Sequence, residues 1–301
     1  MKNILVIGAA GQIGSELVPA LRKLGFMTVA GFSRTPLTPE LAAGGPSERI
    51  DILDGTGLVD VIRRHRIDTV FNLAAMLSAK AEAQPLSAWN VGVNGLLNVL
   101  EAARIEHCAV FTPSSIGVFG DSTPHAKTPQ DTVCRPKTVY GITKVTGELL
   151  SDYYFLKYGV DTRSVRYPGL ISSVTPPGGG TTDYAVDIFY SAVCGETYVC
   201  PIAAGTFMTM MYMDDAVDAA VNLMTADPAG LIHRNSFNVT AYSFDPEGIA
   251  AEIRRVIPDF SMRYEVDTLR QGIAESWPDS LDDTAARSEW GWAPKVTLSD
   301  M

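Results

Sequence analysis

Short apolar runs alternate with longer amphipathic stretches along the first half of the chain. The short runs are rich in β-branched and aromatic residues, which favours buried strands, at 3–7, 27–32, 69–73, 108–112 and 162–167. Between them, apolar residues recur with helical spacing at 13–24, 56–65, 86–106 and 139–158. Strands that alternate with helices predict a parallel sheet covered on both faces, and right-handed crossovers make such a sheet doubly wound.

The pattern loosens after Arg166. Residues 174–182 contain two prolines and three glycines, and this composition predicts irregular structure. Short strands and three further helices are expected downstream, with Asp214 and Asp215 capping the second of these helices. The three helical patterns cover 183–194, 216–225 and 247–256.

Composition and charge exclude several classes of partner. Hydrophobic residues make up 46% of the 301 residues, so the chain can bury a large core. The formal net charge is −10 and no Lys/Arg cluster is present, which argues against nucleic acid and anionic membranes as partners. The N-terminal apolar run is broken early by glycines, and no stretch reaches the ~20 apolar residues of a membrane helix. We expect a cytoplasmic protein.

The cysteines and histidines predict no metal site. There are only four histidines, and no two cysteines have the C-x-x-C spacing of a zinc site. Scattered buried thiols are the expected alternative. The four cysteines are Cys108, Cys134, Cys194 and Cys200.

A glycine turn lies directly between the first strand and the first helix. Gly8, Gly11 and Gly14 have the spacing G-x-x-G-x-x-G. Glycines allow a tight turn, a close approach of the backbone to a pyrophosphate, and close packing of helix on strand. The helix start at Gln12 and Ile13 offers free N–H groups and a partial positive charge to phosphates. Glycines often only make turns, but in this position they predict a dinucleotide site.

The end of the second strand lacks the acidic residue that usually accepts hydrogen bonds from the adenosine ribose of NAD. The segment reads Ala-Gly-Phe-Ser-Arg at 30–34. Ser33 and Arg34 suit a 2′-phosphate, because a guanidinium matches phosphate geometry, and this favours NADP. The other interpretation is that Arg34 is a solvated loop residue.

Tyr140 and Lys144 form the most informative pair. Four residues apart on a helix, they lie on one face, one turn apart. A nearby ammonium favours the phenolate, so we expect it to lower the pKa of Tyr140 and make that residue a general base. Ser115 follows an apolar strand upstream of this helix. These residues predict hydride transfer, with Tyr140 taking the proton of a secondary alcohol.

The glycine turn, Ser115 and the Tyr/Lys helix occur in the order typical of the extended short-chain dehydrogenases/reductases, and the chain resembles that family. The resemblance implies a catalytic triad of Ser115, Tyr140 and Lys144. It also implies further cofactor contacts after the third and fourth strands and near the sixth, from Asp51, Ile52, Leu73, Ala74, Ala75 and Tyr167. Asp51 is equally well interpreted as a helix cap or turn residue.

These motifs predict an α/β fold, a Rossmann-type doubly wound parallel sheet with a small C-terminal substrate lobe. The NAD(P)-binding Rossmann domain is expected over residues 1–170, together with parts of the C-terminal third. Residues 171–301 are expected to be mainly the substrate-binding lobe.

A narrower resemblance begins at Arg166. The segments 166–172 and 176–185 look like those of the short-chain-type L-threonine 3-dehydrogenases, and so do Ser276-Trp277-Pro278, Asp282-Asp283 and Trp290-Gly291-Trp292. The resemblance to these dehydrogenases extends over essentially the whole chain, and residues 176–185 are its most specific signal. It implies NAD-dependent oxidation of the C3 hydroxyl of L-threonine to 2-amino-3-oxobutanoate, and a homodimer built on the helices at 86–106 and 139–158. Ordinary core packing explains those apolar helices equally well.

The same resemblance implies a set of substrate contacts, namely Ser78, Ser115, Tyr140, Gly180, Thr181, Thr182 and Trp277. A glycine-rich segment brings backbone groups close to a small zwitterion, and threonines add hydroxyls. A surface turn at Gly180–Thr182 and a packing role for Trp277 are the alternatives. Two other functions remain open: a sugar-nucleotide epimerase or dehydratase of the same fold, and a catalytically silent dinucleotide sensor.

Overall fold

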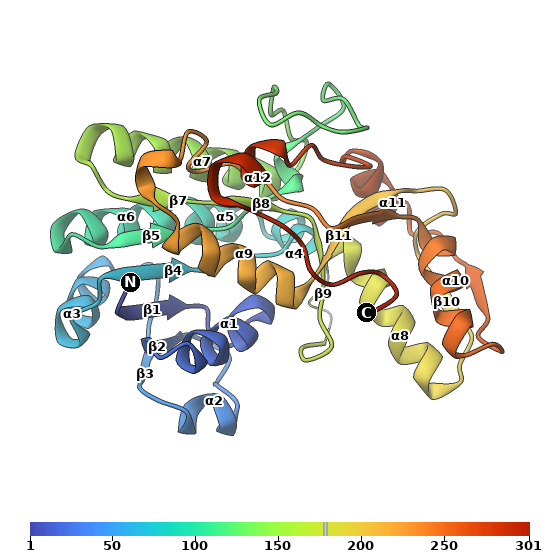
Figure 1. Cartoon of the computed structure of the whole chain (residues 1–301), viewed down its shortest axis with the longest axis horizontal. Coiled ribbons are helices and arrows are strands. Elements are labelled where there is room, and N and C mark those ends of the chain that lie inside the picture. Colours follow the sequence, from blue (N-terminus) through green and yellow to red (C-terminus); the bar gives the residue numbers. More distant parts are fainter. Residues whose placement is uncertain (177, 179) are drawn as a thin grey trace.

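The computed structural model describes residues 1–176, 178 and 180–301, so Pro177 and Gly179 of the segment 176–185 lie outside the described residues. The main sheet has six parallel strands in the order β3-β2-β1-β4-β5-β7. The predicted doubly wound parallel sheet is therefore confirmed (Figure 1). Its strands are β1 (Asn3–Ile7), β2 (Met27–Phe32), β3 (Ser47–Arg49), β4 (Thr69–Asn72), β5 (Ala109–Phe111) and β7 (Thr162–Arg163).

Side chains of β1 alternate between two cores, one on each face of the sheet. Ile4 and Val6 pack with α1 (Gln12–Lys23), α9 (Met213–Thr225) and α12 (Thr284–Trp290). Leu5 and Ile7 pack on the other face with α3 (Gly55–His65), α6 (Gly95–Glu106) and α7 (Val139–Tyr158). Both faces are buried because every strand of a parallel sheet is followed by a crossover that covers it. The short helix α2 (Pro39–Ala43) lies between β2 and β3.

Two predicted elements are divided in the structure. The helix expected over 86–106 consists of α5 (Pro85–Trp89), a π-helical segment (Asn90–Asn94) and α6. The strand expected over 162–167 is split into β7 and β8 (Val165–Tyr167), because β8 leaves the main sheet to pair with β6 (Ser114–Ser115) and β12 (Phe237–Asn238). The short helix α4 (Ser78–Ala83) precedes α5.

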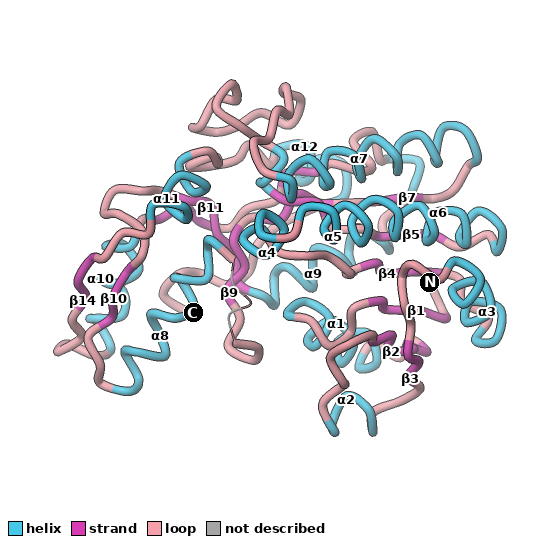
Figure 2. The backbone as a smooth tube through the Cα atoms, turned by 180° about the vertical axis from the view of Figure 1, so that it is seen from behind, coloured by secondary structure: helices cyan, strands magenta, loops and turns pink. Residues whose placement is uncertain are grey.

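The rest of the C-terminal third forms a second core beyond the carboxyl ends of the strands (Figure 2). In one of its sheets β11 (Met208–Tyr212) pairs with both β9 (Gly169–Ile171) and β13 (Tyr242–Phe244). In the other, β10 (Tyr198–Cys200) pairs with β14 (Met262–Tyr264). Its helices are α8 (Tyr184–Cys194), α10 (Pro246–Val256) and α11 (Thr268–Glu275). No helix in the described part of the chain combines the length and apolar character needed to cross a membrane.

The capping role expected of Asp214 and Asp215 is wrong. Helix α9 begins at Met213, directly after β11, so both aspartates lie within its first turn. Asp215 is buried, and its carboxylate accepts hydrogen bonds from the backbone N–H groups of Lys295 at 2.8 Å and Val296 at 3.1 Å. Asp215 therefore holds residues 295 and 296 at the first turn of α9.

Candidate active site

The glycine turn between β1 and α1 lies so close to neighbouring backbone that a side chain on Gly8 or Gly14 would collide with it. Gly8 has φ +86°, and a Cβ there would lie 3.1 Å from the carbonyl carbon of Leu73 and 3.2 Å from the Ala74 nitrogen. A Cβ on Gly14 would overlap the Gly8 carbonyl oxygen and Ala9. The turn therefore packs tightly against the loop after β4 while its own surface stays bare, as a dinucleotide cradle requires.

The start of α1 fits a phosphate. Gly11 occupies the cap position, no side chain caps the helix, and no acidic residue lies in the first turn. The side-chain nitrogen of Gln12 is buried and has no hydrogen-bond partner among the described residues. Free N–H groups, the helix dipole and an unpartnered donor together fit the pyrophosphate of a nicotinamide dinucleotide.

The ends of neighbouring strands surround this cradle. The Gly31 carbonyl accepts hydrogen bonds from Gly8 N–H at 3.0 Å and Ala9 N–H at 2.9 Å, so Ser33 and Arg34 follow directly beside the glycine turn. Ser33, Arg34 and Asp51 are exposed and Ile52 is buried. The carboxylate of Asp51 accepts a hydrogen bond from Leu53 N–H at 3.0 Å, which is the turn role considered from the sequence.

Ser115, Tyr140 and Lys144 lie together where β6 meets α7. The Ser115 side chain hydrogen-bonds Tyr140, and Ser115 Oγ accepts from Gly117 N–H at 3.1 Å. The Lys144 Nζ lies 5.6 Å from the centroid of the Tyr140 ring and donates to the carbonyl oxygen of Pro113 at 2.7 Å. The structure thus brings together the three residues of the predicted triad.

Local sequence fixes where α7 begins, and therefore where Tyr140 lies. Thr138 caps the helix by accepting a hydrogen bond from Gly141 N–H at 3.0 Å, and Glu82 of α4 accepts one from Val139 N–H at 2.7 Å. A Cβ at Gly141 would collide with the Gly117 carbonyl oxygen, so glycine lets α7 approach the turn after β6. Gly117 in turn leaves room for the Tyr140 ring, whose atoms come within 3.1 Å of where its Cβ would be.

Burial governs the ionisation of Tyr140 and Lys144. It raises the pKa of Tyr140 above its ordinary value, and the Ser115 hydrogen bond opposes this effect. Burial lowers the pKa of Lys144 from 10.5 to about 8, and the charge of Glu148 opposes that shift. The expectation that Lys144 lowers the pKa of Tyr140 is therefore not met, because the ammonium is directed at the Pro113 carbonyl and burial is the larger effect.

A cavity of about 140 Å³ lies between the triad and the C-terminal lobe. All seven predicted substrate contacts line it, together with Gln12, Ile13, Leu73, Ala75 and Tyr167. The Thr181 hydroxyl is buried and has no hydrogen-bond partner among the described residues. Lys144 is the only cationic side chain among the described residues that line the cavity. Tyr167 offers its backbone and ring, because its hydroxyl donates to the Ala216 carbonyl oxygen at 2.5 Å.

Comparison with known proteins decides the family. The model of the NAD dependent epimerase/dehydratase family matches residues 4–239, which is more than half of the chain. The chain belongs to this family. An uncharacterised epimerase/dehydratase of Staphylococcus aureus is 51% identical over 303 residues, which cover 100% of this chain and 94% of that protein.

Solved structures within this epimerase/dehydratase fold confirm the narrower resemblance. The L-threonine dehydrogenase of Clostridium difficile matches with a TM-score of 0.97 and 51% identity, over 100% of this chain and 95% of the other. The L-threonine dehydrogenase of Cupriavidus necator in its holo form matches with a TM-score of 0.95 and 48% identity, over 99% and 96% of the two chains.

A buried carboxylate beside the triad was missed from the sequence. Glu148 of this epimerase/dehydratase family member accepts hydrogen bonds from Ser114 Oγ at 2.5 Å and from Arg166 Nε and Nη2 at 2.9 and 2.8 Å. Arg166 and Glu148 thus form a buried salt bridge. The spacing along the sequence could have revealed Glu148. Tyr140, Lys144 and Glu148 follow one another at intervals of four residues, so all three share one face of the helix.

The segment that follows β9 is hydrogen-bonded to α1. Ser172 Oγ donates to the Glu16 carboxylate at 2.5 Å, and the hydroxyls of Ser15 and Thr175 hydrogen-bond at 2.8 Å. Burial raises the pKa of Glu16, and the Ser172 hydrogen bond opposes this effect. Residues that follow β9 are thus anchored to the first turns of α1, next to the dinucleotide cradle.

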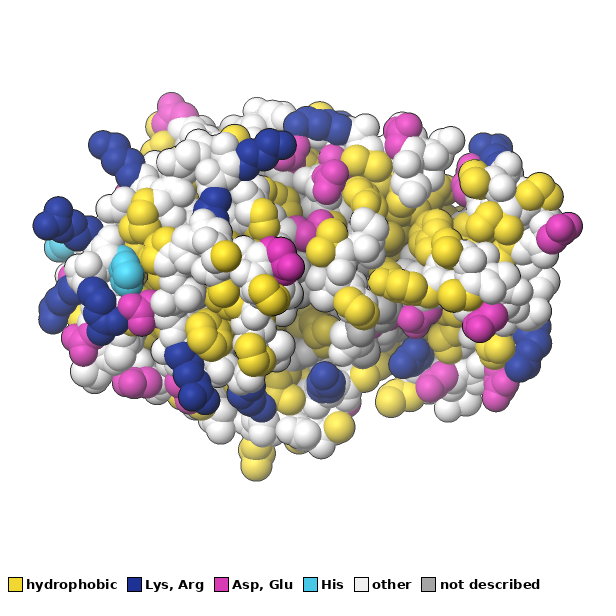
Figure 3. Space-filling model, turned by 90° about the horizontal axis from the view of Figure 1, so that it is seen from below, with side chains coloured by type: hydrophobic (Ala, Val, Ile, Leu, Met, Phe, Trp, Pro, Cys, Tyr) yellow, Lys and Arg dark blue, Asp and Glu magenta, His cyan; other side chains and the backbone are white. Residues whose placement is uncertain are grey.

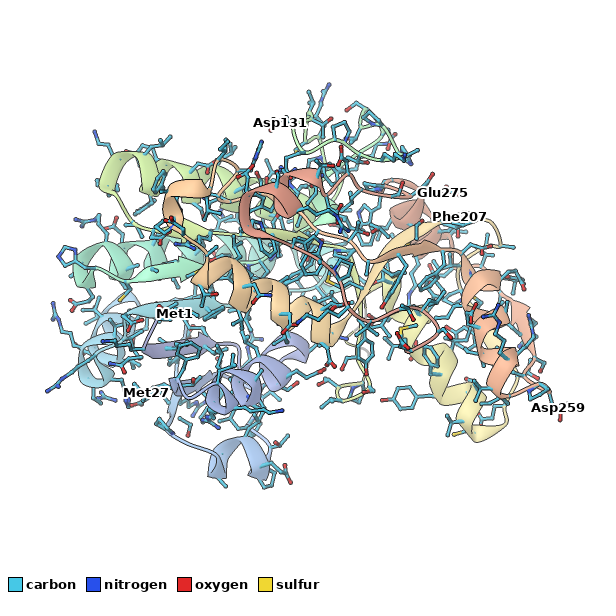
Figure 4. The ribbon with its side chains drawn as sticks, viewed as in Figure 1. Met1, Met27, Asp131, Phe207, Asp259 and Glu275 are labelled. Carbon is cyan, nitrogen blue, oxygen red and sulfur yellow. The ribbon has the colours of Figure 1, made fainter. Side chains whose placement is uncertain are left out.

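A separate open groove lies on the outer side of the C-terminal lobe. It is lined by residues that include His125, Phe207, Glu275 and Asp279. Phe207 and Glu275 lie on the same side of the lobe, well away from Met1 and Met27 of the Rossmann sheet (Figure 4). No group of three or more His, Cys, Asp or Glu side chains in the described part of the chain is arranged to hold a metal ion.

Proposed function

We propose that this chain oxidises the C3 hydroxyl of L-threonine to 2-amino-3-oxobutanoate with a nicotinamide dinucleotide as the hydride acceptor. The observation that carries this proposal is the cavity in front of Tyr140. Hydroxyls, aromatic side chains, the Asp183 carboxylate and, among the described residues, one ammonium line it. A small neutral zwitterion needs only such groups. A sugar nucleotide carries a diphosphate, which needs additional cationic partners. The similarity to solved L-threonine dehydrogenases supports the same substrate.

Each polar group in the cavity has a distinct role in this reaction. Tyr140 removes the proton of the C3 hydroxyl as phenolate, and Ser115 hydrogen-bonds the same oxygen. Thr181 supplies a free hydroxyl to the amino acid. A bound dinucleotide supplies the nicotinamide ring that accepts the hydride from C3. Lys144 holds the ribose of that dinucleotide; its Nζ lies 5.6 Å from the centroid of the Tyr140 ring, which supports this role.

The test is the formation of reduced nicotinamide, followed by its absorbance, with L-threonine and either NAD or NADP. The resemblance favours NAD, whereas the missing carboxylate at the end of β2 favours NADP, so both are supplied. Rapid reduction of either coenzyme supports the proposal, with D-threonine as the stereochemical control. Folded protein that binds a dinucleotide but reduces neither coenzyme excludes L-threonine as the substrate.

The alternative function, sugar-nucleotide epimerisation or dehydration, is favoured by the description of the matching family. It requires turnover of a UDP-sugar with a retained coenzyme. The cavity speaks against it, because the described residues contribute no second cation for the diphosphate. Incubation with UDP-glucose in the same assay series separates the two functions.

The homodimer and the cytoplasmic location stay predictions. Leu86 on α5 and Leu149 and Leu156 on α7 are exposed, and these helices lie in one layer (Figure 2). Exposed leucines on adjacent helices are suited to a self-complementary interface between two copies. Light scattering on the purified chain and on a Leu156→Glu variant tests this: a dimer that the substitution dissociates supports the interface.

A further inference from the structure

The segment that leaves β2 is free of carboxylates for ten residues. Residues 30–39 read Ala-Gly-Phe-Ser-Arg-Thr-Pro-Leu-Thr-Pro, and Glu40 in α2 is the first acidic residue after the strand. In dinucleotide-binding folds, a carboxylate at this point accepts hydrogen bonds from the adenosine ribose hydroxyls. The same carboxylate repels a phosphate on the 2′ oxygen. This chain therefore has neither the usual ribose acceptor nor the usual barrier to a 2′-phosphate.

The position of the segment relative to the cradle is set by backbone hydrogen bonds. Gly31 accepts from the N–H groups of Gly8 and Ala9, and Phe32 accepts from Ile50 N–H at 2.7 Å. The end of β2 is thus held between the glycine turn and the segment after β3. Ser33 and Arg34 follow at once, at the edge of the sheet where the adenosine half of a dinucleotide binds.

Two arginines whose side chains have no partner among the described residues lie at this edge. Arg34 follows Phe32 by two residues, and Arg49 of β3 is the register partner of Phe32. Both are exposed, and neither makes a hydrogen bond, an ion pair or a ring contact with any residue that the structure describes. Arg22 on the nearby α1, by contrast, donates to the carbonyl oxygens of Leu41, Thr28 and Pro46.

The one nearby strand carboxylate is directed elsewhere. Glu48 of β3 accepts from Arg64 at 2.7 Å and contacts His65 at 2.8 Å, both on α3. Because side chains alternate along a strand, Arg49 points to the opposite face from Glu48. The face of the molecule seen from below shows most of its Lys and Arg side chains over the Rossmann half (Figure 3). Arg34, Arg49 and the Ser33 hydroxyl therefore lie along one edge of the sheet. The carboxylate of the exposed Asp51, two residues after Arg49, accepts a hydrogen bond from Leu53 N–H and pairs with neither arginine.

We propose that Ser33, Arg34 and Arg49 bind the 2′-phosphate of NADP(H), so that this chain takes the phosphorylated dinucleotide in preference to NAD(H). The inference rests on the dinucleotide site of the proposed function and names its coenzyme. Arginines hold a phosphate through charge-assisted, two-point hydrogen bonds, and the serine hydroxyl adds a further donor.

The test is calorimetric titration of the folded chain, without threonine, with adenosine 2′,5′-bisphosphate and with adenosine 5′-monophosphate. The two probes differ only in the 2′-phosphate. We expect the bisphosphate to bind about tenfold or more tightly than the monophosphate, because a charge-assisted hydrogen bond contributes that much. Adenosine 3′,5′-bisphosphate has the same charge in another place and should show no such preference.

Variants identify the residues. Arg34→Ala and Arg49→Ala should each reduce the preference for the 2′-phosphate roughly tenfold. Ser33→Asp should reverse it, because the new carboxylate repels the phosphate and accepts from ribose hydroxyls. Arg255→Ala is the matched control, because it removes an exposed arginine of α10 in the other lobe and should leave both affinities unchanged.

The outcomes separate this inference from the proposed function. Equal binding of the two probes, or tighter binding of the monophosphate, overturns the 2′-phosphate site and leaves threonine oxidation standing. Binding of neither probe overturns both. A clear preference for the 2′-phosphate in a protein that does not oxidise threonine supports the 2′-phosphate site and contradicts only the assignment of L-threonine as the substrate.

Discussion

Glu148 on α7, one turn after Lys144, and Arg166 on β8 form a buried two-point ion pair, with both side chains under 10% exposed. The first prediction concerns this pair. Glu148→Gln leaves the Arg166 guanidinium buried without its counter-charge. We expect it to lower the free energy of unfolding by about 3–5 kcal/mol. Urea denaturation of the variant and the wild type measures the difference.

Glu252→Gln is the control for that measurement. Glu252 pairs with Arg255 on the exposed surface of α10, so its loss should change the free energy of unfolding by less than about 1 kcal/mol. If Glu148→Gln behaves like this control, the buried pair is not what holds α7 against β8.

The second prediction concerns the general base. Tyr140→Phe removes the hydroxyl but keeps the ring that packs against Gly117. We expect threonine oxidation to fall roughly a hundredfold to ten-thousandfold, with nucleotide affinity unchanged. Tyr153→Phe, an exposed tyrosine of the same helix, is the control and should keep full turnover. Near-normal turnover of Tyr140→Phe removes Tyr140 as the base.

The third prediction is the pH dependence of oxidation. Because burial raises the pKa of Tyr140, the phenol predominates at neutral pH and the reactive phenolate fraction increases with each unit of pH. We expect the logarithm of kcat/KM to rise with a slope near one up to about pH 8 and less steeply above it, where Lys144, with its pKa of about 8, loses its charge. A profile that falls between about pH 6 and 8 contradicts the assignment.

The fourth prediction concerns stability and Lys144. Its pKa in the folded protein is about 8, below the ordinary value of 10.5, so the unfolded chain binds more protons between these two values. The destabilisation caused by the buried ammonium is present below pH 8 and disappears as the pH rises toward 10.5. The free energy of unfolding of the wild type, relative to Lys144→Met, should therefore rise between about pH 8 and 10.5.

Lys157→Met provides the reference for that comparison. Lys157 is exposed near the end of the same helix, so its substitution should leave the relative stability constant over this pH window. A constant difference for Lys144→Met as well shows that burial of its ammonium does not affect folding.

Local signals predicted the parts of the fold that local chemistry determines. The bounds of α7 followed from its apolar spacing, and those of α1 from the glycine turn that precedes it. The triad residues came together as expected, because parallel strands bring their carboxyl ends to one edge. Tertiary pairing decided the rest. β8 separates from β7 to join β6, and α9 begins at Met213 because β11 ends there.

Energetic features were the hardest to predict. No local rule shows that Asp215 holds the backbone of Lys295, eighty residues away. The sign of the shift in the pKa of Tyr140 depends on how deeply the surrounding elements bury it, which the spacing to Lys144 does not reveal. Glu148 had the visible spacing, but its partner Arg166 comes from another element.

The hydrogen bond from Ser172 to Glu16 and the one between Thr175 and Ser15 hold the residues that follow β9 against the first turns of α1. Because these bonds join the two proposed binding sites, we predict that a dinucleotide at the start of α1 and an amino acid beside Thr181 bind with linked free energies. By thermodynamic reciprocity, the factor by which the dinucleotide changes the affinity for the amino acid equals the factor by which the amino acid changes the affinity for the dinucleotide.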